Sequence, residues 1–173
     1  MFSKNDYVIY STEGICRVED IRPVSFDIPH MPSEERIYYV LSPLSKSGAS
    51  VYVPIENEQL VAKMRRVLTK EEINEAIDAS AKKPLPDLSD RRRRTMIYKA
   101  VTDSMKCELV LLLVRALYEW RQALALEGKK MAFSDSEMLA RCELSVAAEF
   151  AFSLGIEKSE VGTYIQNRFE QIK

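Results

Sequence analysis

Glycine, cysteine and histidine are scarce in this 173-residue chain, which holds 5 glycines, 3 cysteines and 1 histidine. Loops that cradle phosphate groups need glycine, so the composition disfavours a nucleotide-using enzyme. An odd number of widely separated cysteines argues against a disulfide framework and against a zinc site. The single histidine, His30, has no nucleophile or metal-ligand partner at a recognisable spacing, and we expect it to be an exposed loop residue. We therefore expect no catalytic residues, no cofactor, no metal and no small-molecule substrate.

Long apolar runs are also missing. The longest, Leu109–Val114, is too short to cross a bilayer. Lys4-Asn5-Asp6 interrupts the chain directly after Met1-Phe2, where a signal peptide would continue as apolar sequence. Both observations predict a cytoplasmic protein that makes no use of a membrane.

Two hydrophobic patterns divide the chain. Up to Ile55 the apolar residues form short β-branched and aromatic runs between turn residues, which is typical of strands, at 7–10, 15–18, 37–41 and 51–53. Arg22–Arg36 contains three prolines, so we expect a long loop there rather than a central strand. From Thr69 onward the spacing is helical. This predicts an α+β protein with a small Tudor- or SH3-like β-barrel over 1–66, followed by a compact all-α bundle over 67–173.

The helices are marked by their ends. Thr69-x-x-Glu72 and Ser134-x-x-Glu137 are predicted capping boxes, and Gly155 is a predicted C-cap. Ser89 or Asp90 is expected to cap a helix that starts with four arginines. The expected helices cover about 69–80, 91–101, 105–126, 134–155 and 158–171, with 81–89 as a proline-containing linker. The third is apolar all round at 109–114, which predicts the central helix of its bundle.

Charge is unevenly distributed although the net charge is only −1. Residues 61–100 hold 11 basic and 6 acidic side chains, a net of +5, between segments of −4 (1–60) and −2 (101–173). The basic segment includes Arg91-Arg92-Arg93-Arg94. It can contact phosphate groups, or it can be a solvated helix start that pairs with Asp87, Asp90 or Asp103. Both interpretations stay open at this point.

Several short motifs occur in an order that resembles the CarD family of CarD/CdnL-like bacterial transcription regulators. They are Phe2 with Asp6-Tyr7-Val8-Ile9-Tyr10, Gly14, Val18, Ile21, Tyr38–Leu41, Val53-Pro54-x-x-Asn57, Val114–Leu117, Ser134-x-x-Glu137–Arg141 and Ala147-x-Glu149-x-Ala151. The resemblance implies a Tudor-like domain that binds the β subunit of RNA polymerase. It also implies a helical domain that contacts promoter DNA at the upstream edge of the transcription bubble and modulates open-complex stability, without enzymatic activity.

The resemblance directs attention to two sets of residues. The candidate polymerase-binding residues are Arg22, Arg36, Tyr52, Val53 and Pro54. Because Pro54 lacks an N–H, its strand suits a sheet edge that can accept a partner's strand; Val51 and Val53 can at the same time fill the barrel while Tyr52 points out. The candidate DNA-binding residues are Leu88, Arg91, Arg92, Arg93, Arg94 and Arg141.

Two apolar residues bear on the DNA hypothesis. Family members carry a tryptophan wedge near the start of the helical domain, but Pro86–Arg91 contains none. Leu88 can replace it as a minor-groove wedge, or it can pack under the linker. Trp120 shares the apolar spacing of Leu113 and Leu117, so it is a core residue or, alternatively, an aromatic surface platform.

Three functions are consistent with these features. The first is a regulator that bridges RNA polymerase and promoter DNA. The second is an adaptor on the polymerase whose helical domain binds a protein instead of DNA, which the missing tryptophan favours. The third, a small enzyme, is disfavoured by the lack of a catalytic constellation.

Overall fold

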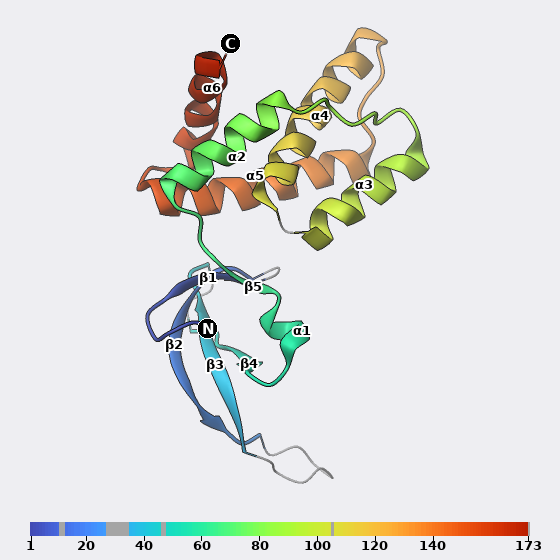
Figure 1. Cartoon of the computed structure of the whole chain (residues 1–173). Coiled ribbons are helices and arrows are strands. Elements are labelled where there is room, and N and C mark those ends of the chain that lie inside the picture. The colour runs from blue at the N-terminus through green and yellow to red at the C-terminus, as the bar shows by residue number, and fades with distance from the viewer. Residues whose placement is uncertain (11–12, 27–34, 46–47, 105, 173) are drawn as a thin grey trace. The chain divides into compact units, whose positions relative to one another are not determined.

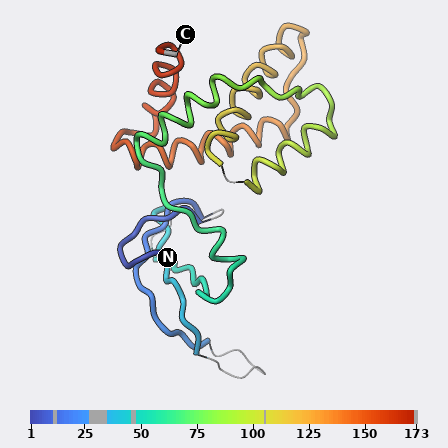
Figure 2. The backbone as a smooth tube through the Cα atoms, viewed as in Figure 1, coloured from blue at the N-terminus to red at the C-terminus, as the bar shows by residue number. Residues whose placement is uncertain are grey.

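A computed structural model describes residues 1–10, 13–26, 35–45, 48–104 and 106–172. The chain forms two compact units, Met1–Val67 and Leu68–Lys173, which we call the sheet unit and the helical unit (Figures 1 and 2). His30 and the neighbouring prolines Pro29 and Pro32 lie outside the described residues, so the expected exposure of His30 stays a prediction.

The sheet unit is a five-stranded antiparallel sheet in the order β4-β3-β2-β1-β5. Its strands are β1 (Tyr7–Tyr10), β2 (Gly14–Val24), β3 (Arg36–Pro43), β4 (Val51–Pro54) and β5 (Met64–Arg66). The predicted α+β class is confirmed, but the predicted closed barrel is not, because the sheet is open. Among the described strands β4 and β5 each pair on one side only, and β4 is therefore an edge strand, as Pro54 indicated.

The prediction of a loop from Arg22 to Arg36 is wrong at both ends. Arg22, Pro23 and Val24 belong to β2 and pair with Tyr38, Ile37 and Arg36. Proline is tolerated here because β1 pairs with β2 over Gly14–Arg17 and, among the described strands, the far end of β2 has a neighbour on one side only. The long β2–β3 arm that results is visible in Figure 1. A missing N–H on the unpaired side of a strand removes no ladder hydrogen bond.

Alternating residues on one face of the sheet form its core. Tyr39, Leu41 and Val53 from β3 and β4 pack against Val8, Cys16, Val18 and Met64. A short helix, α1 (Glu58–Val61), follows β4 and is capped by Asn57, whose Oδ1 accepts from Leu60 N at 3.1 Å. Neither α1 nor β5 was expected from the sequence, because four- and three-residue elements carry too few residues for a period to show.

The helical unit contains α2 (Lys70–Lys82), α3 (Arg91–Ser104), α4 (Cys107–Leu126), α5 (Phe133–Leu154), the 3₁₀ turn η2 (Lys158–Glu160) and α6 (Val161–Ile172). Two apolar clusters hold it together. One joins α2, α4, α5 and α6 through Ile73, Ile77, Leu111, Val146, Phe150 and Val161. The other joins α3, α4, α5 and the linker before α3 through Val101, Leu113, Leu117, Met138, Leu139 and the linker residue Leu88. Helix α4 contributes to both clusters, which confirms its predicted central place.

The helix ends test the predicted caps. Thr69 Oγ1 accepts from Glu72 N at 3.3 Å and Glu72 Oε2 accepts from Thr69 N at 2.9 Å, so the first capping box is confirmed. Asp90 caps α3, since its Oδ1 accepts from Arg93 N at 2.8 Å. Gly155 ends α5 with φ +66°, which favours glycine.

The second capping box, at Ser134, is wrong. Helix α5 starts at Phe133 with Ala132 as its N-cap, so Ser134 already has a helical backbone and cannot cap. The acidic residue in this first turn, Asp135, is buried and binds side chains of α3. The polar residues that suggested a cap therefore include one, Asp135, whose side chain makes a buried contact between α5 and α3.

Candidate functional site

The edge strand β4 is the first candidate site. Ile55 N donates to Ile37 O at 3.0 Å, which fixes which backbone groups point toward β3. Because amides alternate along a strand, the amide of Tyr52 points away from β3, to the free side of β4. Pro54 occupies the next outward position and has no N–H to offer. This edge therefore leaves a short stretch of backbone that a second strand can pair with.

The predicted polymerase-binding residues divide between the two faces of this sheet. The register sets Arg22 opposite Tyr38 and Tyr38 opposite Pro54, and it sets Val40 opposite Tyr52. Arg22, Arg36, Tyr52 and Pro54 therefore lie on the face away from the core. Val53 lies on the other face and is 0% exposed, so its side chain cannot be a direct contact.

Sequence reasoning missed an aromatic cluster on the same face, made of Phe26, Tyr38 and Tyr52. The Phe26 ring lies edge-to-face on both tyrosines, with centroid distances of 5.5 Å to Tyr38 and 5.2 Å to Tyr52. The two tyrosine rings are 6.3 Å apart. Phe26 is 41% exposed although it is a large apolar side chain. The alternation of side chains along paired strands could have placed Tyr38 and Tyr52 on one face of the sheet. Phe26 lies after the end of β2, where no strand pattern indicates which way it points.

The start of α3 is the second candidate site, and its four arginines have different environments. Arg91 and Arg92 are exposed, and neither makes an ion pair or a side-chain hydrogen bond within the described part of the chain. Arg93 is exposed and pairs with Asp87 across 3.4 Å. Arg94 turns inward, with 14% of its side chain exposed. Only the first three can therefore present their charge to an external anion.

Arg94 belongs to a buried polar cluster and not to a DNA-facing surface. Its Nη1 donates to Leu88 O at 2.6 Å, and its Nε lies 3.4 Å from Asp135 Oδ2 as a charge contact without hydrogen-bond geometry. Its guanidinium lies 5.6 Å from the centre of the Trp120 ring. Tyr98 Oη donates to Asp135 Oδ1 at 2.9 Å. Burial and this hydrogen bond raise the pKa of Tyr98, so the phenol stays protonated as the donor.

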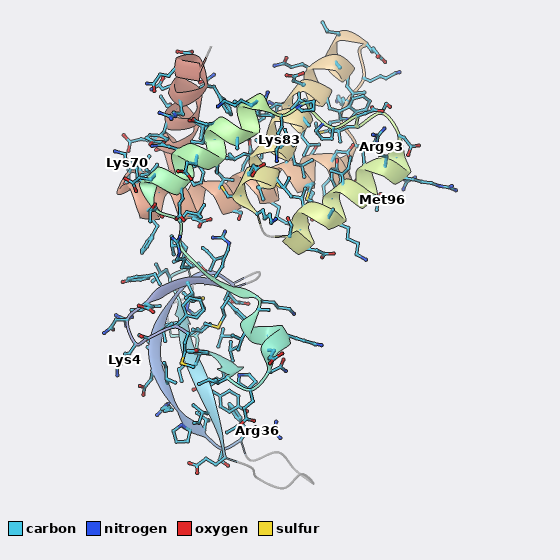
Figure 3. All side chains as sticks on the ribbon, in the orientation of Figure 1. Lys4, Arg36, Lys70, Lys83, Arg93 and Met96 are labelled. Carbon is cyan, nitrogen blue, oxygen red and sulfur yellow. The ribbon has the colours of Figure 1, made fainter. Side chains whose placement is uncertain are left out.

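Leu88 and Trp120 are both explained by packing. Leu88 is 3% exposed within the second apolar cluster, so the alternative that it packs under the linker is supported and the exposed wedge is not. Trp120 is partly buried against the same cluster, as the core interpretation expected. Helix α3 also carries an exposed large apolar side chain, Met96, which is 72% exposed and is labelled in Figure 3.

Arg141 lies on α5 and is exposed. It lines a shallow groove between α3 and α5 together with Thr95, Lys99, Thr102, Asp103 and Glu137. The structure thus brings Arg141 to the same helix pair as the arginine run. The groove carries two cations and two carboxylates, so by itself it has no excess of positive charge.

The described residues offer little for catalysis or metal binding. No three His, Cys, Asp or Glu side chains among them gather closely enough to hold a metal ion. Cys16 and Cys142 are buried, and burial raises the pKa of the Cys142 thiol to about 11, which makes it a poor nucleophile near neutral pH. Across the described ranges, no helix is both long and apolar enough to cross a membrane.

The sheet unit matches a known protein family. Residues 2–68 match the family model of the CarD-like/TRCF RID domain, which confirms over the sheet unit the resemblance that the motifs indicated. The match ends at Leu68, where the helical unit begins. No curated protein matches the chain.

Proposed function

We propose that this chain, in which residues 2–68 are a CarD-like/TRCF RID domain, is a non-enzymatic bacterial transcription regulator that works in the cytoplasm. The RID domain family interacts with the β subunit of RNA polymerase and is a protein-interaction family, not a catalytic one. We assign polymerase binding to residues 1–66 and contact with promoter DNA to residues 67–173. The observation that carries the first assignment is the free edge of β4 within a matched RID domain.

The polymerase contact uses strand addition in this proposal. A segment of the β subunit pairs with the outward backbone groups at Tyr52 and Pro54, and backbone hydrogen bonds supply much of the affinity. Side chains on the outer face, including Arg22, Arg36 and Tyr52, then make the specific contacts. In this proposal Val53 contributes indirectly, because its side chain packs in the core and fixes the position of β4.

The DNA contact in this proposal lies on the outer face of α3. Arg91, Arg92 and Lys99 supply charge, Arg93 adds to it when its pair with Asp87 opens, and Arg141 extends the surface onto α5. Arginine contacts to phosphate position a protein without reading sequence. Two weak contacts in one chain reinforce each other through effective concentration, so the protein can brace the upstream edge of the bubble and modulate open-complex stability.

A second candidate is an adaptor whose helical unit binds another protein. Two observations favour it: Leu88 is buried and cannot act as a wedge, and the α3–α5 groove has as many carboxylates as cations. Co-purification of the full chain with RNA polymerase, with and without promoter DNA, separates the two. The regulator should be retained more strongly when DNA is present. Equal retention in both cases supports the adaptor, and no retention in either contradicts the polymerase assignment.

The arginine run provides a quantitative prediction about DNA. Arg91→Ala and Arg92→Ala should each flatten the plot of log K against log salt by about one unit, because each lost phosphate contact releases one counterion fewer. The thermal midpoint should stay nearly unchanged, since both side chains are exposed. Fluorescence anisotropy of a labelled duplex at several salt concentrations measures the slope.

The matched control is Lys158→Ala, which removes an exposed cation in η2, away from α3. It should leave the slope as it is in the wild type. If Arg91→Ala and Arg92→Ala change the slope no more than Lys158→Ala does, the outer face of α3 is not the DNA contact.

A further inference from the structure

The cluster of Phe26, Tyr38 and Tyr52 places exposed apolar surface directly beside an unpaired strand edge. Phe26 reaches it from beyond the end of β2, and Tyr38 and Tyr52 are diagonal neighbours on β3 and β4. A free edge with an apolar flank favours uncontrolled pairing between chains, and proteins usually blunt such edges with charge or cover them. β4 is short and ends in Pro54, which limits such pairing, but beside Tyr52 its flank is aromatic and offers apolar surface to a partner.

An acidic groove adjoins the same edge. It is lined by Arg36, Pro54, Glu56, Asn57, Glu58 and Gln59. The two carboxylates exceed the single guanidinium, and residues 1–60 carry 9 acidic and 5 basic side chains in total. Asn57 Oδ1 is already engaged as the cap of α1, accepting from Leu60 N at 3.1 Å, and is not available to a ligand in that arrangement. The groove therefore favours a cation on whatever covers β4.

Pro54 belongs both to β4 and to the groove. A strand that pairs with β4 therefore reaches the groove whether it runs parallel or antiparallel to β4. Side chains on such a strand alternate between faces at about 3.3 Å per residue. One that faces outward beside Tyr52 meets the aromatic cluster. Another, a few residues along, comes within reach of Glu56 and Glu58.

We propose that the aromatic cluster and the acidic groove together select the polymerase segment that docks on β4: an extended strand that carries an apolar side chain and, a few residues away, a lysine or arginine. This rests on the proposed binding of the β subunit by the sheet unit. Phe26 is then a specificity residue, since it supplies the exposed part of the apolar surface without belonging to the core. Glu56 and Glu58 steer the basic residue during encounter.

The test is binding of the full chain to core RNA polymerase by surface plasmon resonance at several salt concentrations. Phe26→Ala should weaken binding by about tenfold, mainly through faster dissociation, because it removes a central apolar contact. Glu56→Lys should slow association severalfold and flatten its salt dependence, because it reverses a charge at the rim. Circular dichroism should not change, since both residues are exposed.

Two controls match these variants. Leu44→Ala removes an exposed apolar side chain (52%) from the same unit at the end of β3, and Glu170→Lys makes the same charge change on α6. Both should bind within about twofold of the wild type. If the wild type binds and Phe26→Ala and Glu56→Lys behave like their controls, the inference fails while the proposed function stands. If the wild type does not bind polymerase, both fail. A wild-type dimer that Phe26→Ala converts to a monomer would assign the surface to a second copy and overturn the inference.

Discussion

Replacing Arg94 with alanine should destabilise the helical unit by about 3 kcal/mol, whereas Arg92→Ala should change its stability by less than about 0.5 kcal/mol. The two residues are two positions apart in one run of arginines, but only Arg94 is enclosed. Its side chain is 14% exposed and that of its partner Asp135 is 4% exposed. Loss of the guanidinium leaves a buried carboxylate without its cation, and the carbonyls of Leu88 and Ser89 lose their donor.

Urea unfolding followed by Trp120 fluorescence measures this effect. Trp120 is the only tryptophan of the chain, so the signal reports on the helical unit. The midpoint is the quantity to compare, because removal of the guanidinium beside the indole also changes the emission itself. In a double-mutant cycle, Arg94→Ala with Asp135→Ala should cost less than the sum of the single changes, since the second removes the orphaned charge. Full additivity would contradict the buried ion pair.

Val53→Asp should unfold the sheet unit and with it abolish polymerase binding, while Tyr52→Glu should keep the fold and weaken binding. Val53 is 0% exposed among Val8, Val18, Tyr39 and Leu41, where a carboxylate finds no partner. The free energy needed to bury that charge exceeds the folding stability expected of so small a domain. Tyr52 is on the opposite face, partly exposed, so glutamate there disturbs the docking surface and the aromatic cluster without entering the core.

Far-ultraviolet circular dichroism and proteolysis of the N-terminal residues separate the two outcomes from each other, and polymerase co-purification gives the binding result. Val53→Ala is the control for size, because it removes volume without adding charge and should retain a folded sheet that still binds. Polymerase binding by a folded Val53→Asp variant would contradict the burial of this side chain. Undiminished binding by Tyr52→Glu would move the contact away from β4.

Much of the helical unit was predictable because its signals are local. The Thr69–Glu72 box, the Gly155 cap and the apolar spacing of α4 depend on residues within one or two turns of each other. The four arginines show the limit. Their helical position was predictable, but which of them turns inward depends on Asp135, 41 positions along the chain, and no local pattern contains that pairing.

The sheet unit shows a different limit. Strand parity correctly predicted that Tyr52 and Val53 face opposite sides. Closure of the sheet was not predictable, because whether the ends of a sheet pair depends on twist accumulated over all its strands. The Ser134–Glu137 motif failed for a third reason: polar residues at a helix start can satisfy backbone groups or, as Asp135 does, side chains of a neighbouring helix.

Helix α4 contributes to both apolar clusters of the helical unit, and Val110 packs against each. Neither cluster can therefore repack by itself, because a displacement of α4 that suits one cluster removes packing contacts from the other. We therefore expect the helical unit to unfold as one cooperative unit. An amino-acid change that suits one cluster is constrained by the other, so sequence divergence in this unit should proceed by coordinated substitutions on the two sides of α4.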